Sequence, residues 1–479
     1  MSVQEQKPVN DSSSPPQQVT ALNQEPVLAP SNEDKEPSPS GSTVFKPPRK
    51  SKKGTLRVLL IVLVLAVLGV AGYFLLNKVK VKDSGDDGVL VYWGLWEDEE
   101  IMQEVISEWE KNNPGTKIEY IRQQKEEYRQ RLQSALSRGE GPDIFRFHNT
   151  WVPMLQKELA SLPSSVMSAA EFEETFYPVA VSDLRSGADF YGLPLAIDTL
   201  ALFYNEDIFR TARKEPPQNW LELRNLASDL TVRDSQGQVQ VAGIAMGGVE
   251  NIDHWSDVLG LMMLQNGVDL RKPRGNLAED ALLFYSYFLR RDKGWNPNFP
   301  NSTEAFAVER AAMFFGFSWD VFEIQRINKD LNFKVVPVPQ LPERKEVAWA
   351  SYWVEGVSER SSKQEKAWEF LKFLTEKETM RKLYQAQVAS RGFFGEPYSR
   401  KDLADEASDN PLLAPFLKQA SFAQSWYLCS RTFDNGLNEG MIDYYKNAVN
   451  KVNESGNAKE ALETAISGIA QVASRWKLP

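Results

Sequence analysis

Aromatic and polar side chains follow two of the predicted strands of this chain, at the point where each strand ends. Trp96 and Glu97 come shortly after the apolar run VLVYW, and Asn149, Thr150 and Trp151 follow the run DIFRF. Because ligands of open α/β sheets bind beyond the carboxyl ends of the strands, we expect these two loops to border one crevice. Indole rings stack on apolar surfaces, and carboxylate, amide and hydroxyl groups form hydrogen bonds. These residue types predict noncovalent binding.

The residues that covalent or metal chemistry requires are scarce. The chain has two histidines, His148 and His254, and one cysteine, Cys429. It contains no H-E-x-x-H, no C-x-x-C, no P-loop and no nucleophile elbow. A single cysteine excludes an intrachain disulfide. We therefore expect no catalytic residues, no metal ligands and no cofactor.

Alternating strands and helices would position the two loops. The apolar patterns predict strands at 89–93, 117–121 and 143–147, separated by helices over about 98–112 and 128–138. This order predicts parallel strand pairing with right-handed crossovers.

The later part of the chain continues the same alternation. We expect Ser318 to be the N-cap of a helix that carries Trp319 and Asp320. Trp109, Trp220 and Trp368 lie on the apolar faces of predicted helices, so we expect them in the core. The other predicted elements are a helix at 220–230, strands at 311–317, 333–338 and 352–357, a helix at 367–374 and mostly helix from 441 to 476.

A run of 19 residues without charge, 58–76, predicts a transmembrane helix, which we place at 56–77. Six basic residues lie between Lys46 and Arg57, whereas three lysines and three aspartates follow the run before residue 88. This bias predicts a cytoplasmic N-terminus, an extracellular C-terminal part and a single pass through the cell membrane. A cleaved signal peptide is the alternative, but more than fifty residues precede the run and no A-x-A site follows it.

The regions on the two sides of this helix differ in composition. Residues 1–55 are rich in proline, serine and glutamine, and we expect a disordered cytoplasmic tail there. Residues 78–87 form a linker, and 88–479 contain all thirteen tryptophans and form the globular domain. In that domain 56 acidic residues outnumber 44 basic ones, which disfavours a nucleic-acid partner.

Four segments in order resemble the extracellular solute-binding proteins of ABC importers, in the sugar-binding group that includes maltose-binding protein. The segments are FYGLPLAIDTLALFYNEDIF at 190–209, PPQNWLEL at 216–223, AAMFFGFSWD at 311–320 and SYWVEGVS at 351–358, which the helix KAWEFLKFL follows. The resemblance covers essentially all of 88–479. It implies an α/β fold with two lobes that close over a ligand at a hinge. Lobe one would comprise about 88–196 and 350–395, and lobe two about 197–349 and 396–479, with chain crossings near 194–201 and 349–354.

The resemblance also implies a sugar site between the lobes, which requires aromatic platforms and partners for hydroxyl groups. The residues also have alternative roles. The tryptophans can belong to the core, Asp198 can cap or brace the hinge, and Arg391 can pair with a surface acid. Glu355 can favour a hydroxyl-rich or cationic ligand or join an interlobe salt bridge. The expected ligand-binding residues are Trp96, Glu97, Asn149, Trp151, Asp198, Trp319, Asp320, Trp353, Glu355, Arg391 and Trp426.

The expected function is therefore that of a monomeric, membrane-anchored binding protein. It would capture a small solute, a sugar or oligosaccharide, and deliver it to the permease subunits of an ABC importer. Two alternatives remain open at this stage. One is a solute-sensing subunit of a signalling system, and the other is a surface glycosidase that uses Glu97 and Glu355 as paired carboxylates.

Overall fold

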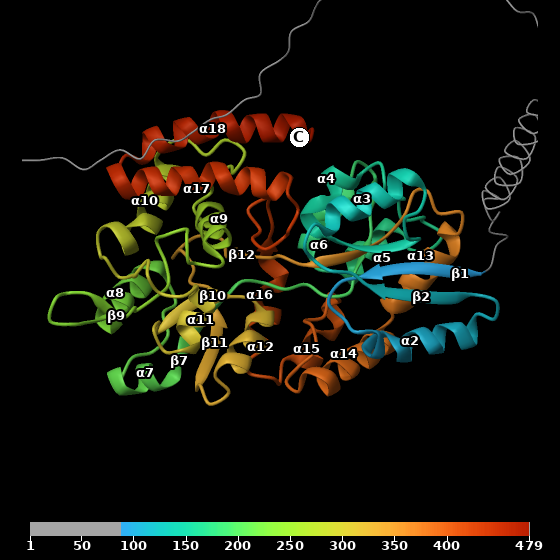
Figure 1. Ribbon diagram of the computed structural model, residues 1–479, viewed down its shortest axis with the longest axis horizontal. Coiled ribbons are helices and arrows are strands. Elements are labelled where there is room, and N and C mark those ends of the chain that lie inside the picture. The colour runs from blue at the N-terminus through green and yellow to red at the C-terminus, as the bar shows by residue number, and fades with distance from the viewer. Residues whose placement is uncertain (1–87, 479) are drawn as a thin grey trace, which may run out of the picture. The chain divides into compact units, whose positions relative to one another are not determined.

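The computed structural model describes residues 88–478 (Figure 1). The predicted tail, the predicted transmembrane helix at 56–77 and the predicted linker at 78–87 lie outside these residues. Within 88–478, none of the helices has the length and apolar character needed to cross a membrane.

The first sheet has five strands in the order β2 (Lys117–Arg122), β1 (Val89–Gly94), β3 (Ile144–His148), β13 (Trp353–Val357) and β6 (Leu193–Pro194). Strand β1 pairs in parallel with both β2 and β3, which confirms the predicted parallel arrangement. Strand β13 returns much later in the chain and is antiparallel to β3 and β6. The carboxyl ends of β1 and β3 therefore lie at one edge of this sheet, beside the start of β13.

Helices α2 (Glu99–Asn112), α3 (Tyr128–Arg138), α13 (Gln364–Leu374) and α14 (Lys377–Arg391) accompany this sheet (Figure 1). The buried face of α2 consists of the five apolar residues that its helical periodicity predicts, ending at Trp109. Trp109 packs edge-on against Phe370 of α13, with 5.5 Å between the ring centroids. We call this sheet and its helices the first lobe.

The second sheet has three antiparallel strands in the order β10 (Met313–Gly316), β7 (Ala201–Asn205) and β11 (Phe333–Pro337). All residues of β7 and β10 are buried, whereas Lys334 of β11 is exposed. We call this sheet and its helices the second lobe. Its main helices are α8 (Trp220–Leu230), α9 (Trp255–Gln265), α10 (Asn276–Arg290), α12 (Ser318–Ile327), α17 (Leu437–Ser455) and α18 (Ala458–Arg475).

Short elements connect these parts. The helical ones are η1 (Asn149–Trp151), α4 (Val152–Leu155), α5 (Ala169–Thr175), α6 (Pro178–Asp183), α7 (Glu206–Ala212), α11 (Ser302–Ala307), η2 (Lys401–Leu403), α15 (Ala404–Ala407), α16 (Ala414–Gln419) and η3 (Ala420–Phe422). The short strands are β4 (Arg185–Ser186), β5 (Asp189–Phe190), β8 (Val232–Arg233), β9 (Val239–Val241), β12 (Ala348–Trp349) and β14 (Ala423–Gln424).

The chain passes from one sheet to the other in adjacent segments. Residues 195–200 join β6 to β7, and β12 leads into β13. The two segments are hydrogen bonded, because Leu200 donates its N–H to the carbonyl of Trp349 at 2.8 Å and Ser351 donates to that of Asp198 at 3.1 Å. Strand β14 pairs with β12 on the other side. We call these three segments the crossover.

The start of α12 differs by one residue from the prediction. Ser318 is the first helical residue rather than the N-cap, which is Phe317. The carboxylate of Asp320 accepts the N–H of Phe317 at 2.8 Å, so an acidic side chain in the first turn satisfies the helix start. The Ser318 hydroxyl is then free to donate to Asp198.

Gly260 in α9 permits close packing against the crossover. A Cβ atom at this position would lie 2.6 Å from the ring of the fully buried Trp349, whereas one at Gly440 in α17 would meet nothing closer than 3.4 Å. We therefore expect Gly260→Ala to lower the free energy of unfolding by about 1–3 kcal/mol through overpacking. Gly440→Ala should raise it by up to about 1 kcal/mol through helix propensity. Denaturant titrations measure both; equal effects of the two variants would contradict this packing.

Candidate functional site

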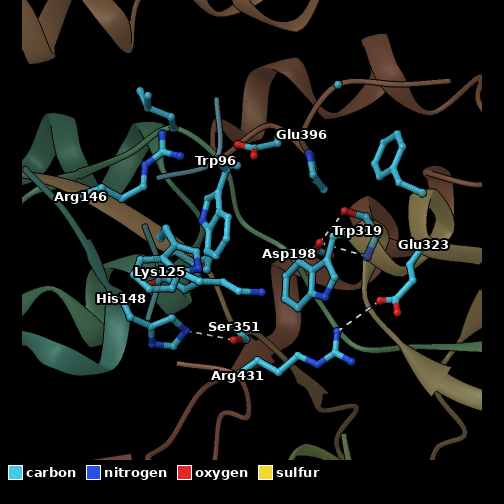
Figure 2. A pocket seen from close by; sticks show the side chains of 18 of the residues that line it. Trp96, Lys125, Arg146, His148, Asp198, Trp319, Glu323, Ser351, Glu396 and Arg431 are labelled. Atoms are coloured by element: carbon cyan, nitrogen blue, oxygen red, sulfur yellow. Dashed lines mark hydrogen bonds and ion pairs between the residues drawn. The ribbon is translucent and has the colours of Figure 1, made fainter. Parts of the chain in front are cut away.

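A cavity of about 340 Å³ lies where the two lobes and the crossover meet (Figure 2). The first lobe contributes Trp96 and Trp353, the second contributes Trp319, and the crossover contributes Asp198 and Ser351. The remaining lining residues are Lys125, Arg146, His148, Leu195, Ala196, Ser318, Phe322, Glu323, Tyr352, Arg391, Gly395, Glu396, Pro397, Ser430, Arg431 and Phe433.

Tryptophan rings form opposite walls of the cavity. Trp96 and Trp353 meet edge to face, with ring centroids 5.5 Å apart, and the buried Trp151 supports Trp353 from behind at 5.3 Å. From the second lobe, Trp319 is stacked on Phe317 with 4.4 Å between centroids and 14° between planes. Trp96, Trp319 and Trp353 are only half-buried, so they retain surface that a flat ligand can cover.

A buried ion-pair cluster lies behind the first-lobe wall. Arg146 of β3 pairs with Glu355 of β13 at 2.6 Å and with Glu97 of the β1 loop. Burial raises the pKa of Glu355, and the positive charge of Arg146 offsets this effect only in part. At Glu97 burial also disfavours the charge, but Arg146 and Arg391 together hold its pKa below the usual value.

Arg391 and Glu396 extend this cluster to the cavity. The Arg391 guanidinium lies 3.7 Å from the carboxylate of Glu97 and 3.5 Å from that of Glu396. Partial burial and the charge of Glu97 raise the pKa of Glu396 to about 7. Arg391 therefore pairs with carboxylates of the site itself.

A second ion-pair cluster lies behind Trp319. His254 lies 2.9 Å from Asp320 and 3.7 Å from Asp257. Burial opposes its charge, but these two carboxylates outweigh burial and raise the pKa of His254 to about 9, so the ring is an imidazolium at neutral pH. Arg431 pairs with Asp253 at 2.7 Å, and its guanidinium lies 3.5 Å from Asp320.

Asp198 joins the crossover to the second lobe. Its carboxyl accepts the N–H of Thr199 at 2.8 Å and both the N–H, at 3.0 Å, and the hydroxyl of Ser318. Burial nevertheless raises the pKa of Asp198 to about 8. Since Asp198 also lines the cavity, it can brace the hinge and face a ligand at once.

His148 connects the crossover to the first lobe. Its Nε2 lies 3.0 Å from the hydroxyl of Ser351, and its Nδ1 lies 2.8 Å from the hydroxyl of Thr150. Burial lowers the pKa of His148 to about 3, so the ring is neutral. The neutral ring therefore joins Ser351 to Thr150 through hydrogen bonds.

The structure divides the predicted ligand-binding residues into two groups. Those that line the cavity are Trp96, Asp198, Trp319, Trp353 and Arg391, and those that do not are Glu97, Asn149, Trp151, Asp320, Glu355 and Trp426.

The members of the second group make other contacts. Glu97, Glu355 and Asp320 belong to the two ion-pair clusters. Asn149 donates to Asp183 and to Ser425, both at 2.8 Å, and Trp426 packs on Tyr427 with centroids 5.4 Å apart.

Several lining residues were not predicted from the sequence. Trp319, Phe322 and Glu323 are spaced i, i+3 and i+4 on α12, so they share one helix face. This helical spacing is the sequence signal that places Phe322 and Glu323 beside Trp319. Arg431 and Phe433 offer no such signal, because they lie in a loop where both adopt positive φ angles, 56° and 53°, without being glycine.

Metal-ion chemistry has no assembled ligand set here. In the described part of the chain, no group of three or more histidine, cysteine, aspartate or glutamate side chains is arranged to hold a metal ion. The acidic residues of the two ion-pair clusters are paired with arginine or histidine, and Asp198 accepts hydrogen bonds from Thr199 and Ser318.

The profile of the bacterial extracellular solute-binding proteins matches residues 93–381. A putative binding protein of Brucella abortus is 28% identical over 159 residues, which make up 32% of this chain and 38% of that protein. The matched residues therefore span well under two thirds of that relative's length. The diacetylchitobiose binding protein of Streptomyces coelicolor is 22% identical over 342 residues, 64% of this chain and 76% of that protein.

Among solved structures, the sugar-binding protein MalE of the phytopathogen Xanthomonas citri superposes with a TM-score of 0.67 and 17% identity. The match covers 81% of this chain and 98% of that one. At this identity the likeness concerns the fold, and it confirms the predicted two-lobed α/β architecture.

Arg146 compensates two buried carboxylates at once. We expect Arg146→Met to lower the free energy of unfolding by about 3–5 kcal/mol, because it leaves Glu97 and Glu355 buried without this guanidinium. Combining it with Glu97→Gln and Glu355→Gln should recover more than half of the loss. Denaturant unfolding of both variants measures this difference. Wild-type stability of the single variant would show that the cluster does not depend on Arg146.

Proposed function

Since this chain belongs to the family of bacterial extracellular solute-binding proteins, we propose that it binds a sugar or oligosaccharide in the cavity between its lobes. The family and the similar proteins are binding proteins, so the chain is not an enzyme. The prediction that it carries out no catalysis agrees with this membership.

The observation that carries the sugar proposal is the arrangement of the aromatic walls. Trp96 and Trp353 come from the first lobe and Trp319 from the second, and all three keep exposed ring surface in the cavity. Sugar rings have apolar faces that such platforms cover. The hydroxyls of Ser318 and Ser351 and the carboxyl of Asp198 lie on the same lining, where they can pair with sugar hydroxyls.

The crossover supports a closing motion around the solute. Three chain segments join the lobes, and the cavity lies against them. Hinge closure of this kind concentrates the change of backbone angles in a few residues between rigid lobes. A solute that contacts both walls would favour the closed arrangement.

Delivery of the solute to the permease of an ABC importer completes the proposal. Residues 56–77 would anchor the domain to the outer face of the cell membrane as a single pass, with a cytoplasmic N-terminus, and the domain would act as a monomer without a cofactor. The family description supports the extracellular location of the domain. A solute-sensing subunit of a signalling system would use the same cavity. Binding of the protein to a permease, rather than to a signalling protein, distinguishes the transport function from the sensing function.

The paired-carboxylate alternative has a structural counterargument. Glu97 and Glu355, the paired carboxylates of the glycosidase alternative, both bind Arg146, and neither lines the cavity. A glycosidase would need both carboxyl groups beside the scissile bond.

The stacking walls can be tested by calorimetry of the purified chain against a panel of mono- and oligosaccharides. We expect Trp319→Ala and Trp353→Ala each to weaken binding roughly tenfold or more, about 1.4 kcal/mol, while unfolding stays cooperative. Trp476→Ala is the matched control, because Trp476 packs beside Arg475 at the end of α18 and does not line the cavity. Unchanged affinity in both cavity variants would refute stacking, and no binding across the panel would refute the sugar proposal.

The anchor can be tested by removing residues 1–83. We expect the full chain to sediment with membranes and to be released only by detergent, because about 20 apolar residues span a hydrocarbon core. The shortened chain should remain in the aqueous fraction as a monomer with unchanged sugar affinity. Recovery of the full chain in the aqueous fraction without detergent would refute the anchor.

A further inference from the structure

Acidic groups outnumber basic groups around the cavity in the first lobe. Glu97, Glu355 and Glu396 share two guanidinium groups, those of Arg146 and Arg391. Arg146 serves Glu97 and Glu355, and Arg391 is divided between Glu97 and Glu396 at 3.7 and 3.5 Å. Of the three carboxylates Glu396 is the one that lines the cavity, and its side chain is 26% exposed.

The second lobe has the same imbalance. Asp253, Asp257, Asp320 and Glu323 share one guanidinium and one imidazolium, those of Arg431 and His254. Arg431 lies closest to Asp253, at 2.7 Å, and is 3.7 Å from Glu323. Glu323 lines the cavity, and its side chain is 32% exposed.

Glu396 follows α14 and donates its N–H to Gln387 of that helix, so Glu323 and Glu396 enter the cavity from opposite lobes. Each shares its nearest guanidinium with other carboxylates, Glu396 at 3.5 Å from Arg391 and Glu323 at 3.7 Å from Arg431. Figure 2 shows both carboxylates at the cavity beside the ring of Trp319 or of Trp96. Partial burial and nearby carboxylates leave such groups under-compensated, which agrees with the raised pKa of Glu396. A ligand that brings positive charge would complete both clusters.

Lys125 is the remaining basic group on the lining. It lies in an exposed loop, and its ammonium lies 5.0 Å from the ring centroid of Phe433. No ion pair within the described range involves it. Even with Lys125 included, the carboxylates of the two clusters outnumber the cations around the cavity.

We propose that the solute is an amino sugar, an oligosaccharide with primary ammonium groups such as one built from glucosamine, and that Glu323 and Glu396 bind those ammonium groups. This inference rests on the proposed sugar-binding function of the cavity. Hydroxyl groups can donate hydrogen bonds to a carboxylate, but an ammonium also supplies the missing charge. The faces of Trp96 and Trp319 provide further attraction for a cation.

The test compares three ligand series that share the same linkage. They are β-1,4 oligomers of glucosamine, of glucose and of N-acetylglucosamine, two to four units long, which differ at one substituent per ring. Calorimetry uses the full chain in a detergent without a sugar head group. We expect glucosamine oligomers to bind about tenfold or more tightly than both neutral series, since a charge-assisted hydrogen bond exceeds a neutral one by that much.

Charge-neutral variants assign the preference to residues. Glu323→Gln and Glu396→Gln should each reduce the preference for the glucosamine series about tenfold and change binding of the neutral series much less. Glu365→Gln is the control, because this exposed glutamate of α13 lies outside the cavity lining. Lys125→Met removes a positive charge from an exposed loop of the cavity lining, so it should strengthen binding of the glucosamine series alone. Thermal unfolding verifies that each variant folds.

The outcomes separate this inference from the proposed function. The amino-sugar inference is overturned if the glucosamine series binds no more tightly than a neutral series, or if only another sugar of the wider panel binds. Either result leaves the proposed sugar binding in place. Preference for the glucosamine series that survives both glutamate variants overturns the assignment to Glu323 and Glu396. Absence of binding to every sugar tested overturns both proposals.

Discussion

The first lobe depends on one buried guanidinium. Arg146 stands on β3 in the centre of the sheet and pairs with Glu97 after β1 and with Glu355 on β13. Trp96 precedes Glu97, and Trp353 lies two residues before Glu355 on the same side of its strand. The ion pairs therefore hold the loop after β1 and the start of β13, which carry Trp96 and Trp353. An arginine suits this place because its planar group can serve two carboxylates at once.

The second lobe uses a comparable arrangement around His254. The imidazolium bonds Asp320 of α12, and Asp257 accepts the indole N–H of Trp349 in the crossover at 2.8 Å. Trp319 rests on Phe317, which in turn meets the His254 ring edge to face at 5.1 Å. Each wall of the cavity is thus supported from behind by buried charge. Such clusters contribute little net stability, but removal of one partner leaves an uncompensated charge, so they hold a specific geometry.

Sequence patterns predicted the framework of this protein better than the site. Strands β1 to β3 and their helices follow from hydrophobic periodicity, which is a local property. The partners of Arg146 are 49 and 209 residues away in the chain, so no local pattern indicates that Glu97 and Glu355 turn away from the cavity. Arg431 and Phe433 reach the cavity through left-handed backbone at non-glycine residues, which only tertiary contacts can enforce. Trp96 follows a predicted strand, whereas Trp319 and Trp353 were predicted through the resemblance to the family; all three line the cavity.

The crossover is both the connection between the lobes and part of the cavity lining. Ser351 is held to the first lobe by His148, and Asp198 is held to the second lobe by Ser318. Both residues face the cavity, and a hydrogen bond of 3.1 Å joins their backbones. A rotation of one lobe against the other must therefore move Asp198 or Ser351 relative to a bound molecule. Asp198 and Ser351 line the cavity and also form hydrogen bonds of the crossover. Binding of the proposed solute and closure of the lobes would therefore draw on one set of hydrogen bonds, without a separate relay between them.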